Sequence, residues 1–206
     1  MGDRRTRVKM CGLRRPEDID AVNELKPEYI GFVFASGSRR YIAPREAAEL
    51  RKRLDPGIRA VGVFTDAAPE EVARLLEEGV IALAQLHGHE DAAYLAALRK
   101  ITGKPLIQAF RIREAADARR AEASGADAVL LDAGAGDGKT FDWDLVKGIR
   151  RPYFLAGGLT PENAGQAVRE LKPFAVDVSS GIETDGIKDA ARMRAFMRAV
   201  RGNDKA

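Results

Sequence analysis

Eight short apolar segments recur at similar intervals along the whole chain and restrict the folds that are open to it. They are rich in Val, Ile, Leu and Phe and cover residues 7–11, 29–34, 59–64, 82–86, 106–110, 128–132, 153–156 and 175–178. Short continuous apolar runs are typical of strands that are covered on both faces, as in a parallel sheet. We therefore predict eight buried parallel strands.

The segments between these runs have the spacing of amphipathic helices. Apolar residues recur every three or four positions in 70–78 and in 91–101, which predicts helices that cover the sheet. Prolines stand where first helical residues are expected, at positions 16, 44, 69 and 161, and glycines where helices should end, at 79, 103 and 125.

A strand followed by a helix, repeated eight times within 206 residues, predicts an α/β protein. The arrangement that fits is a (β/α)8 barrel, also called a TIM barrel, formed by residues 1–206 as a single domain. A doubly wound open sheet is the main alternative. No segment rich in Pro, Ser and Gly divides the chain into two parts.

Composition limits the surroundings and partners of the protein. No run of about 18 apolar residues could span a bilayer, and the initial MGDRRTR is not followed by the apolar stretch of a secretion signal. We therefore expect a cytoplasmic protein that does not bind membranes. The 34 basic and 31 acidic residues are interspersed, which argues against nucleic acid and weakly favours small anionic ligands. A monomer and a homodimer both remain open.

The chain has one cysteine, Cys11, at the end of the first predicted strand. It cannot form an internal disulfide, and one cysteine with two histidines is too few for a usual structural zinc site. The free thiol either packs as a small apolar group or takes part in chemistry. In a (β/α)8 barrel the strand ends form the active site, and His87 and Asp132 stand at or just beyond two other predicted strand ends.

Small residues follow the last two predicted strands. Loops at these positions commonly bind phosphate through backbone N–H groups and the start of a short helix. The residues expected to do so here are Gly157, Gly158, Ser180 and Gly181. The alternative for the two adjacent glycines is a tight turn into a helix that Thr160 caps and Pro161 begins. We favour phosphate binding and expect a phosphorylated substrate.

Strand alternation places Lys9 on the same face as Cys11, one layer lower. If the barrel closes, Asp177 of the last strand can face Lys9, which predicts a buried ion pair. Such a pair either only satisfies a buried lysine or also favours the Cys11 thiolate. Lys188 and the outer helix faces are expected to lie in water, and residues 137–140, beside Gly134, Gly136 and Gly138, to close over a substrate.

Six strings at these positions resemble the phosphoribosylanthranilate isomerase family. They are VKMCG at 8–12, GFVF at 31–34, QLHG at 85–88, GKTFDW at 138–143, LAGGLTPEN at 155–163 and VDVSSGIE at 176–183. The strings occur in the family's order and extend over nearly the entire chain.

The resemblance implies an Amadori rearrangement in tryptophan biosynthesis, without cofactor or metal. It converts N-(5-phosphoribosyl)anthranilate into 1-(2-carboxyphenylamino)-1-deoxyribulose 5-phosphate. Asp132 is implied as the general acid for the ribose ring oxygen and Cys11 as the general base for the C2 proton. These roles call for a raised carboxyl pKa and a lowered thiol pKa. We expect Phe34 and Trp143 to desolvate Asp132, and either Lys9 or the N-terminus of a following helix to favour the ionised form of Cys11.

The resemblance also implies substrate-binding residues. An arginine in SRRY at 38–41 should bind the anthranilate carboxylate through a two-pronged contact. Arg39 stands where the family commonly has proline, and of the two candidates we favour Arg40. His87 and Asp177 are expected beside the substrate, whereas His89 is expected on the surface.

Other functions remain possible on the same fold. A pentose-phosphate epimerase would need metal-binding histidines at several strand ends, and the chain has two histidines in all. An indole glycerol phosphate synthase would need a catalytic lysine pair. A barrel that only binds a phosphorylated ligand would be expected to lack Cys11 or Asp132, and both are present. A second substrate from histidine biosynthesis stays open.

Overall fold

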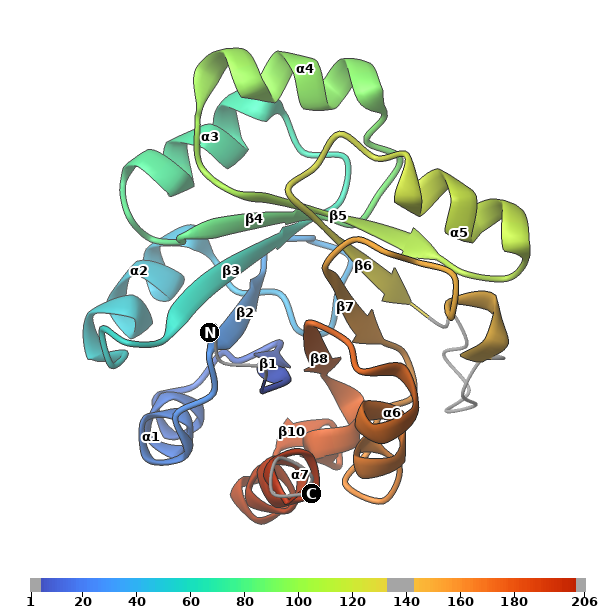
Figure 1. Cartoon of the computed structure of the whole chain (residues 1–206). Coiled ribbons are helices and arrows are strands. Elements are labelled where there is room, and N and C mark those ends of the chain that lie inside the picture. The colour runs from blue at the N-terminus through green and yellow to red at the C-terminus, as the bar shows by residue number, and fades with distance from the viewer. Residues whose placement is uncertain (1–4, 133–142, 203–206) are drawn as a thin grey trace.

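The computed structural model describes residues 5–132 and 143–202, and its centre is a closed parallel barrel (Figure 1). Neighbouring strands pair in chain order, and β1 pairs with β8, with Lys9 opposite Asp177. The strands are β1 (Arg7–Cys11), β2 (Tyr29–Val33), β3 (Arg59–Phe64), β4 (Leu83–Leu86), β5 (Leu106–Arg111), β6 (Ala128–Asp132), β7 (Tyr153–Ala156) and β8 (Ala175–Val178). The predicted (β/α)8 barrel is confirmed, and the closing pair excludes an open sheet.

Helices surround the barrel (Figure 1). They are α1 (Pro16–Leu25), α2 (Pro44–Arg53), α3 (Pro69–Glu77), α4 (Ala92–Ile101), α5 (Ala115–Glu122), α6 (Ala164–Leu171) and α7 (Ala190–Arg201). Between β6 and β7, described residues 143–152 contain only the 3₁₀ turn η1 (Trp143–Leu145). The prediction of a helix after every strand is thus wrong for this part of the chain. Gly148 and Pro152 leave too short an uninterrupted segment for a stable α-helix.

Proline positions predicted three helix starts correctly and one incorrectly. The prolines at 16, 44 and 69 are first helical residues, but α6 begins at Ala164 rather than at Pro161. A turn precedes this helix, because the Asn163 side chain accepts from the Thr160 amide and donates to the Gly158 carbonyl. Asn163, not Thr160, occupies the position before the helix.

Strand alternation divides the apolar residues into an outer and an inner core. Val8 and Met10 of β1 pack in the outer core, between the barrel and the helices. The lower layer inside the barrel is bulky and contains Tyr29 and Phe154, whose ring centroids are 5.3 Å apart. The upper layer contains the smaller side chains of Cys11, Val33 and Val63. Large residues therefore close the barrel below, and small ones leave room at the carboxyl ends of the strands.

A short antiparallel hairpin follows β8. It consists of β9 (Glu183–Thr184) and β10 (Ile187–Lys188), and its register places Lys188 opposite Glu183. This hairpin brings two charged residues close to the carboxyl end of β8, a contact that strand periodicity alone does not predict. In the part of the chain that the structure describes, no helix combines the length and apolar character needed to cross a membrane.

Candidate active site

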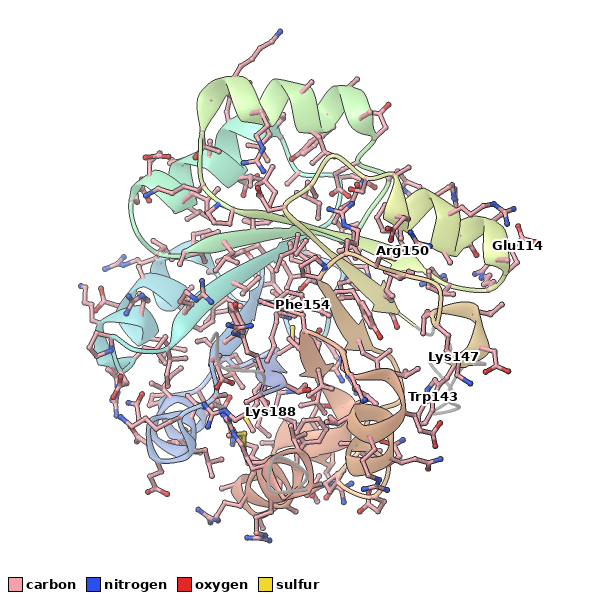
Figure 2. The ribbon with its side chains drawn as sticks, in the orientation of Figure 1. Glu114, Trp143, Lys147, Arg150, Phe154 and Lys188 are labelled. Atoms are coloured by element: carbon pink, nitrogen blue, oxygen red, sulfur yellow. The ribbon has the colours of Figure 1, made fainter. Side chains whose placement is uncertain are left out.

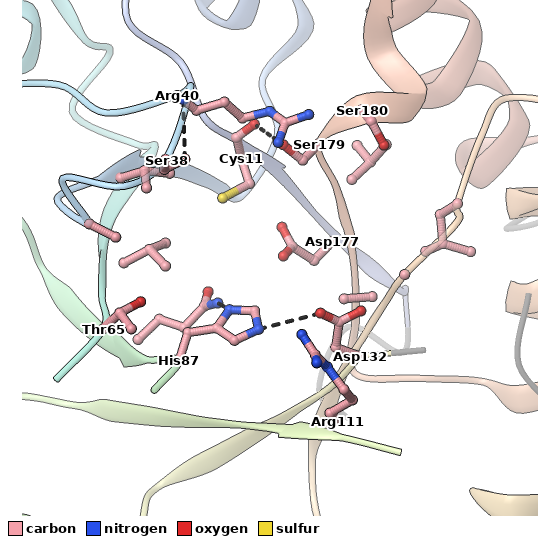
Figure 3. Close-up of a pocket in the computed structure, with 18 of the residues that line it drawn as sticks. Cys11, Ser38, Arg40, Thr65, His87, Arg111, Asp132, Asp177, Ser179 and Ser180 are labelled. Atoms are coloured by element: carbon pink, nitrogen blue, oxygen red, sulfur yellow. Dashed lines mark hydrogen bonds and ion pairs between the residues drawn. The ribbon is translucent and has the colours of Figure 1, made fainter. Parts of the chain in front are cut away.

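A cavity of about 420 Å³ opens at the carboxyl ends of the strands (Figure 3). Its size is typical of small-molecule sites, which occupy roughly 300–1,000 Å³. Eight of the nine residues selected from the sequence line it: Cys11, Arg40, His87, Asp132, Asp177, Gly157, Gly158 and Ser180. The barrel thus brings together side chains that are up to 169 positions apart in the chain (Cys11 to Ser180).

Gly181 is the selected residue that does not line the cavity. It is buried, and a Cβ atom at this position would overlap the carbonyl oxygen of Leu159. The absence of a side chain therefore lets the loop after β8 touch the loop after β7. In that second loop, Gly157 and Gly158 have φ of 90° and 64°, a region that glycine adopts without steric strain. Phosphate binding by these four residues stays a prediction.

The predicted ion pair between Lys9 and Asp177 is confirmed. Lys9 Nζ lies 2.9 Å from Asp177 Oδ1, and the Lys9 side chain is completely buried. Burial alone would lower the pKa of Lys9, but Asp177 and the Cys11 thiol outweigh this effect and raise it. Lys9 is therefore held as a cation inside the barrel, one layer below the cavity.

The pKa of Cys11 differs in direction from the sequence-based expectation. Burial raises the pKa of the thiol above its usual value, and the charge of Lys9 opposes this shift without cancelling it. Asp177 adds to the increase. The predicted lowered thiol pKa is thus wrong, because desolvation of the thiolate outweighs the nearby cation.

Two glycines leave space for reactive side chains. A Cβ atom at Gly31 of β2 would lie 2.6 Å from Cys11 Sγ. Gly12 has a φ of 82°, and a Cβ atom there would lie 2.5 Å from Cδ of Arg40. These glycines belong to the strings VKMCG and GFVF, and the lack of a side chain at each leaves the room that Cys11 and Arg40 require.

Arg40, Glu183 and Lys188 form what we call the Glu183 cluster. Arg40 holds Glu183 through two contacts, Nε to Oε1 at 2.6 Å and Nη2 to Oε2 at 2.8 Å. Burial alone would raise the pKa of Glu183, but hydrogen bonds from Arg40 and Lys188 lower it to about 2. Arg39 also reaches Glu183, at 3.1 Å, but its side chain is 64% exposed and does not line the cavity. The geometry favours Arg40 over Arg39 as the cavity-facing cation.

Lys188 was expected in water, and this expectation is wrong. The residue is buried, and its Nζ donates to the carbonyl oxygen of Ser179 at 2.9 Å and to Glu183 Oε1 at 2.6 Å. Burial lowers the pKa of Lys188, although Glu183 opposes the shift. Ser179 in turn donates its hydroxyl to the carbonyl oxygen of Cys11. The Glu183 cluster therefore supports the backbone of the loop that carries Ser180.

Asp132 contacts a histidine that is itself held by a glutamine. His87 Nε2 lies 3.3 Å from Asp132 Oδ2 (Figure 3). Gln85 Nε2 lies 3.1 Å from His87 Nδ1. Arg111, the last residue of β5, pairs in register with Asp132 and lines the same cavity. Sequence reasoning assigned no role to Gln85 or Arg111. Gln85 could have been found from its position, because it precedes His87 by two residues and alternation then places both side chains on one face. Arg111 was missed because it lies one residue beyond the predicted strand 106–110.

The expected aromatic wall around Asp132 is absent from the described lining residues. Phe34 stacks on Phe64 with ring centroids 5.2 Å apart, and it packs with Trp143 against the outer core. Figure 2 shows Trp143 near the outer edge of the molecule and Phe154 near its centre. His89 is exposed as expected and contacts Asp66. The proposed closing loop, residues 137–140 with Gly134, Gly136 and Gly138, lies outside the described residues.

The eight-stranded parallel barrel defines the chain as a (β/α)8-barrel protein, and its cavity lies at the carboxyl ends of the strands, where the active sites of enzymes with this fold are found. Residues 8–199 match the sequence model of the family described as N-(5'phosphoribosyl)anthranilate (PRA) isomerase. The N-(5'-phosphoribosyl)anthranilate isomerase of Endomicrobium trichonymphae is 42% identical over 200 residues, which cover 95% of this chain and 98% of the relative. The chain belongs to the phosphoribosylanthranilate isomerase family.

Solved structures of the family have the same fold. A phosphoribosylanthranilate isomerase in complex with reduced 1-(o-carboxyphenylamino)-1-deoxyribulose 5-phosphate matches with a TM-score of 0.86 and 34% identity, over 96% of this chain and 99% of that one. Monomers generated from the dimeric enzyme of Thermotoga maritima match with a TM-score of 0.84 and 33% identity, over 96% and 99%. Both a monomeric and a dimeric form are thus described for that relative.

Proposed function

We propose that this chain converts N-(5'-phosphoribosyl)anthranilate into 1-(2-carboxyphenylamino)-1-deoxyribulose 5-phosphate, a step of tryptophan biosynthesis, with Asp132 as general acid and Cys11 as general base. The proposal rests mainly on one observation: the Cys11 thiol and the Asp132 carboxyl group line the same cavity in a member of this family. Cys11 ends β1 and Asp132 ends β6, three strands away around the closed barrel. A sugar between them can be reached from two sides (Figure 3).

The two groups act in sequence. Asp132 donates a proton to the ribose ring oxygen, the bond from this oxygen to C1 breaks, and the anthranilate nitrogen forms a protonated imine with C1. Cys11 then removes the proton on C2, and the electrons of that C–H bond form the C1=C2 bond of an enolamine. Proton transfer from the C2 hydroxyl to C1 gives the ketone. The first two steps move a proton to or from a positioned side chain and the last moves one within the substrate, so no redox cofactor or metal is part of the proposal.

Charge complementarity supports the orientation of the substrate. The phosphate is assigned to the loops that carry Gly157, Gly158, Ser180 and Gly181. The anthranilate carboxylate is assigned to Arg40, whose guanidinium is already fixed by Glu183 at the cavity wall. His87 and Asp177 line the space between these two ends of the substrate. A guanidinium held in place before binding loses less conformational entropy when it meets a carboxylate.

The cellular location and the oligomeric state of the protein are also part of the proposal. A cytoplasmic enzyme that binds neither nucleic acid nor membrane stays our prediction. For assembly we retain a monomer or a homodimer, the two forms described for the relative from T. maritima. Sedimentation velocity over a range of protein concentrations distinguishes them.

The direct test is turnover of phosphoribosylanthranilate, generated in the cuvette and followed by the loss of its fluorescence. We expect Cys11→Ser and Asp132→Asn each to lower kcat by at least about a hundredfold, the contribution of a positioned acid or base. Asp20→Asn makes the same chemical change at an exposed position and serves as the control. Near-full activity in either variant would reject the role of that residue. Ligand binding without turnover in the unchanged chain would identify a non-catalytic binding protein.

A further inference from the structure

The Gln85 amide has a hydrogen-bond partner for its nitrogen but none for its oxygen among the described residues. The residue is 1% exposed and lines the cavity. Its Nε2 contacts His87 Nδ1 at 3.1 Å, whereas its buried Oε1 has no hydrogen-bond partner among the described residues. A buried acceptor without a partner costs about 1–3 kcal/mol, so such atoms are rare and call for an explanation.

The observed amide orientation determines where the His87 ring carries its proton. An amide nitrogen only donates, so Nδ1 of His87 must accept and the proton of the neutral ring must be on Nε2. This Nε2–H then points to Asp132 Oδ2, 3.3 Å away. The arrangement favours an ionised Asp132, which is the form that remains after the acid has given up its proton.

Rotation of the amide by 180° produces the complementary state. Oε1 of Gln85 would then accept a hydrogen bond from Nδ1–H of His87, and the amide nitrogen would occupy the position where Oε1 now has no partner among the described residues. The bare Nε2 of the ring would accept a hydrogen bond from a protonated Asp132, which is the form that a general acid needs before reaction. The two amide orientations have nearly the same shape, so the buried site accommodates both without repacking.

We infer that Gln85 is a positioning residue whose reversible amide orientation matches the His87 tautomer to the protonation state of Asp132. The inference rests on the proposed role of Asp132 as general acid. Side chains of His87 and Asp132 are 35% and 23% exposed, so both exchange protons with water between turnovers. The two states differ by one proton on Asp132, and water supplies or removes it.

Other charged groups face this pair and remain unchanged when Gln85 is replaced. Among the described residues that line the cavity or lie directly below it, they are Arg111 of β5, Asp177 of β8, Lys9 and Cys11 of β1, and Arg40. Lys9 and Asp177 neutralise each other, and Arg40 is paired with Glu183. A change in the His87 tautomer after substitution of Gln85 can therefore be assigned to the amide.

Nitrogen-15 NMR of the histidine rings tests the inference without substrate. The chain has two histidines, and His89→Gln removes the exposed one, which assigns the His87 signals. A pH titration identifies the range in which the ring is neutral, and in that range we expect the unchanged protein to carry the ring proton on Nε2, toward the Asp132 carboxylate. Asp132→Asn replaces the carboxylate with an uncharged group and should raise the share of rings that carry the proton on Nδ1. The same tautomer share in both proteins would overturn the inference.

Two substitutions separate positioning from simple packing. Gln85→Met has similar volume and no hydrogen-bonding amide, so the ring should remain protonated on Nε2 wherever it is neutral. Gln85→Glu offers only acceptor oxygens when ionised and should keep the proton on Nδ1. For Gln85→Met we expect kcat to fall up to about tenfold, the equivalent of one hydrogen bond, with KM changed less than kcat and an altered pH profile.

The outcomes distinguish this inference from the proposed function. If His87 has the same tautomer in Gln85→Met, in Gln85→Glu and in the unchanged protein, the role of Gln85 is overturned, even if turnover is normal. If the unchanged chain does not turn over phosphoribosylanthranilate, the proposed function fails, and the NMR titration still decides whether Gln85 sets the tautomer. Because Gln85→Glu preserves polarity and size, it provides the test if Gln85→Met does not fold.

Discussion

Replacement of Lys9 by methionine is expected to destabilise the protein by about 3–5 kcal/mol, the usual cost of removing one partner from a buried ion pair. The geometry of the pair supports a loss of this size. Lys9 is completely buried, Asp177 has a 10% exposed side chain, and their charged atoms are 2.9 Å apart. Without Lys9, the Asp177 carboxylate must either remain charged and largely buried without its partner or take up a proton.

The loss should be visible in both thermal and chemical unfolding. For a domain of 206 residues, each kcal/mol lowers Tm by about 2–4 °C, so the variant should melt about 6–20 °C below the unchanged protein. Urea titrations give the free energy of unfolding directly. Lys52→Met is the matched control, because Lys52 pairs with Glu49 on the surface, and it should cost less than about 1 kcal/mol.

A double variant isolates the ion pair from the packing of its members. Lys9→Met with Asp177→Leu removes both charges and should recover most of the stability that Lys9→Met loses, because a buried pair is often no better than apolar residues of similar volume. A loss below about 1 kcal/mol in Lys9→Met would refute the reasoning. A double variant that is less stable than Lys9→Met would also refute it, since packing rather than charge would then dominate.

Four further predictions concern the site and the loops around it. Since burial raises the pKa of Cys11, its rate of alkylation by iodoacetamide should keep rising with pH beyond the usual thiol range, and a midpoint below that range would contradict the assignment. Glu183→Gln should raise KM more than it lowers kcat, because Arg40 loses its two-pronged partner; equal effects on both would argue against positioning. The pKa of Glu183 is lowered to about 2, so its ionised form stabilises the fold above the usual carboxyl pKa, and this contribution is lost as pH falls toward 2. Urea unfolding at decreasing pH should therefore show a weaker pH dependence in Glu183→Gln, and an unchanged slope would contradict this. Gly181→Ala should destabilise by about 1–3 kcal/mol or more through overlap with a carbonyl oxygen, whereas Gly37→Ala, at an open position, should not; similar unfolding curves for the two would refute it.

Most of the barrel could be predicted because each strand is a buried apolar run with clear ends. Residues 7–11, 59–64, 128–132, 153–156 and 175–178 were predicted with the bounds that the structure has. The carboxyl ends of parallel strands meet at one rim, so selecting residues at these ends also selected most of the cavity lining. Even the contact between Lys9 and Asp177 followed from alternation and closure alone.

The remaining features depend on how distant segments pack. The burial of Lys188 requires the hairpin of β9 and β10, whose four strand residues have no recognisable periodicity. The direction of the Cys11 pKa shift depends on the balance between burial and the charges of Lys9, Asp177 and Lys188, which sequence does not quantify. The late start of α6 follows from side-chain hydrogen bonds of Asn163 that compete with the first helical turn.

The pairing of Lys9 with Asp177 also has a consequence for how the barrel closes. These residues are 168 positions apart, and they join the first strand to the last. A slip of one residue in the pairing of β1 with β8 would set the Lys9 ammonium opposite Val176 or Val178 and turn the Asp177 carboxylate toward the helices. The charged pair thus penalises every misaligned closure. It also ties the first strand to the eighth, so that the ring of strands closes only when both are in place.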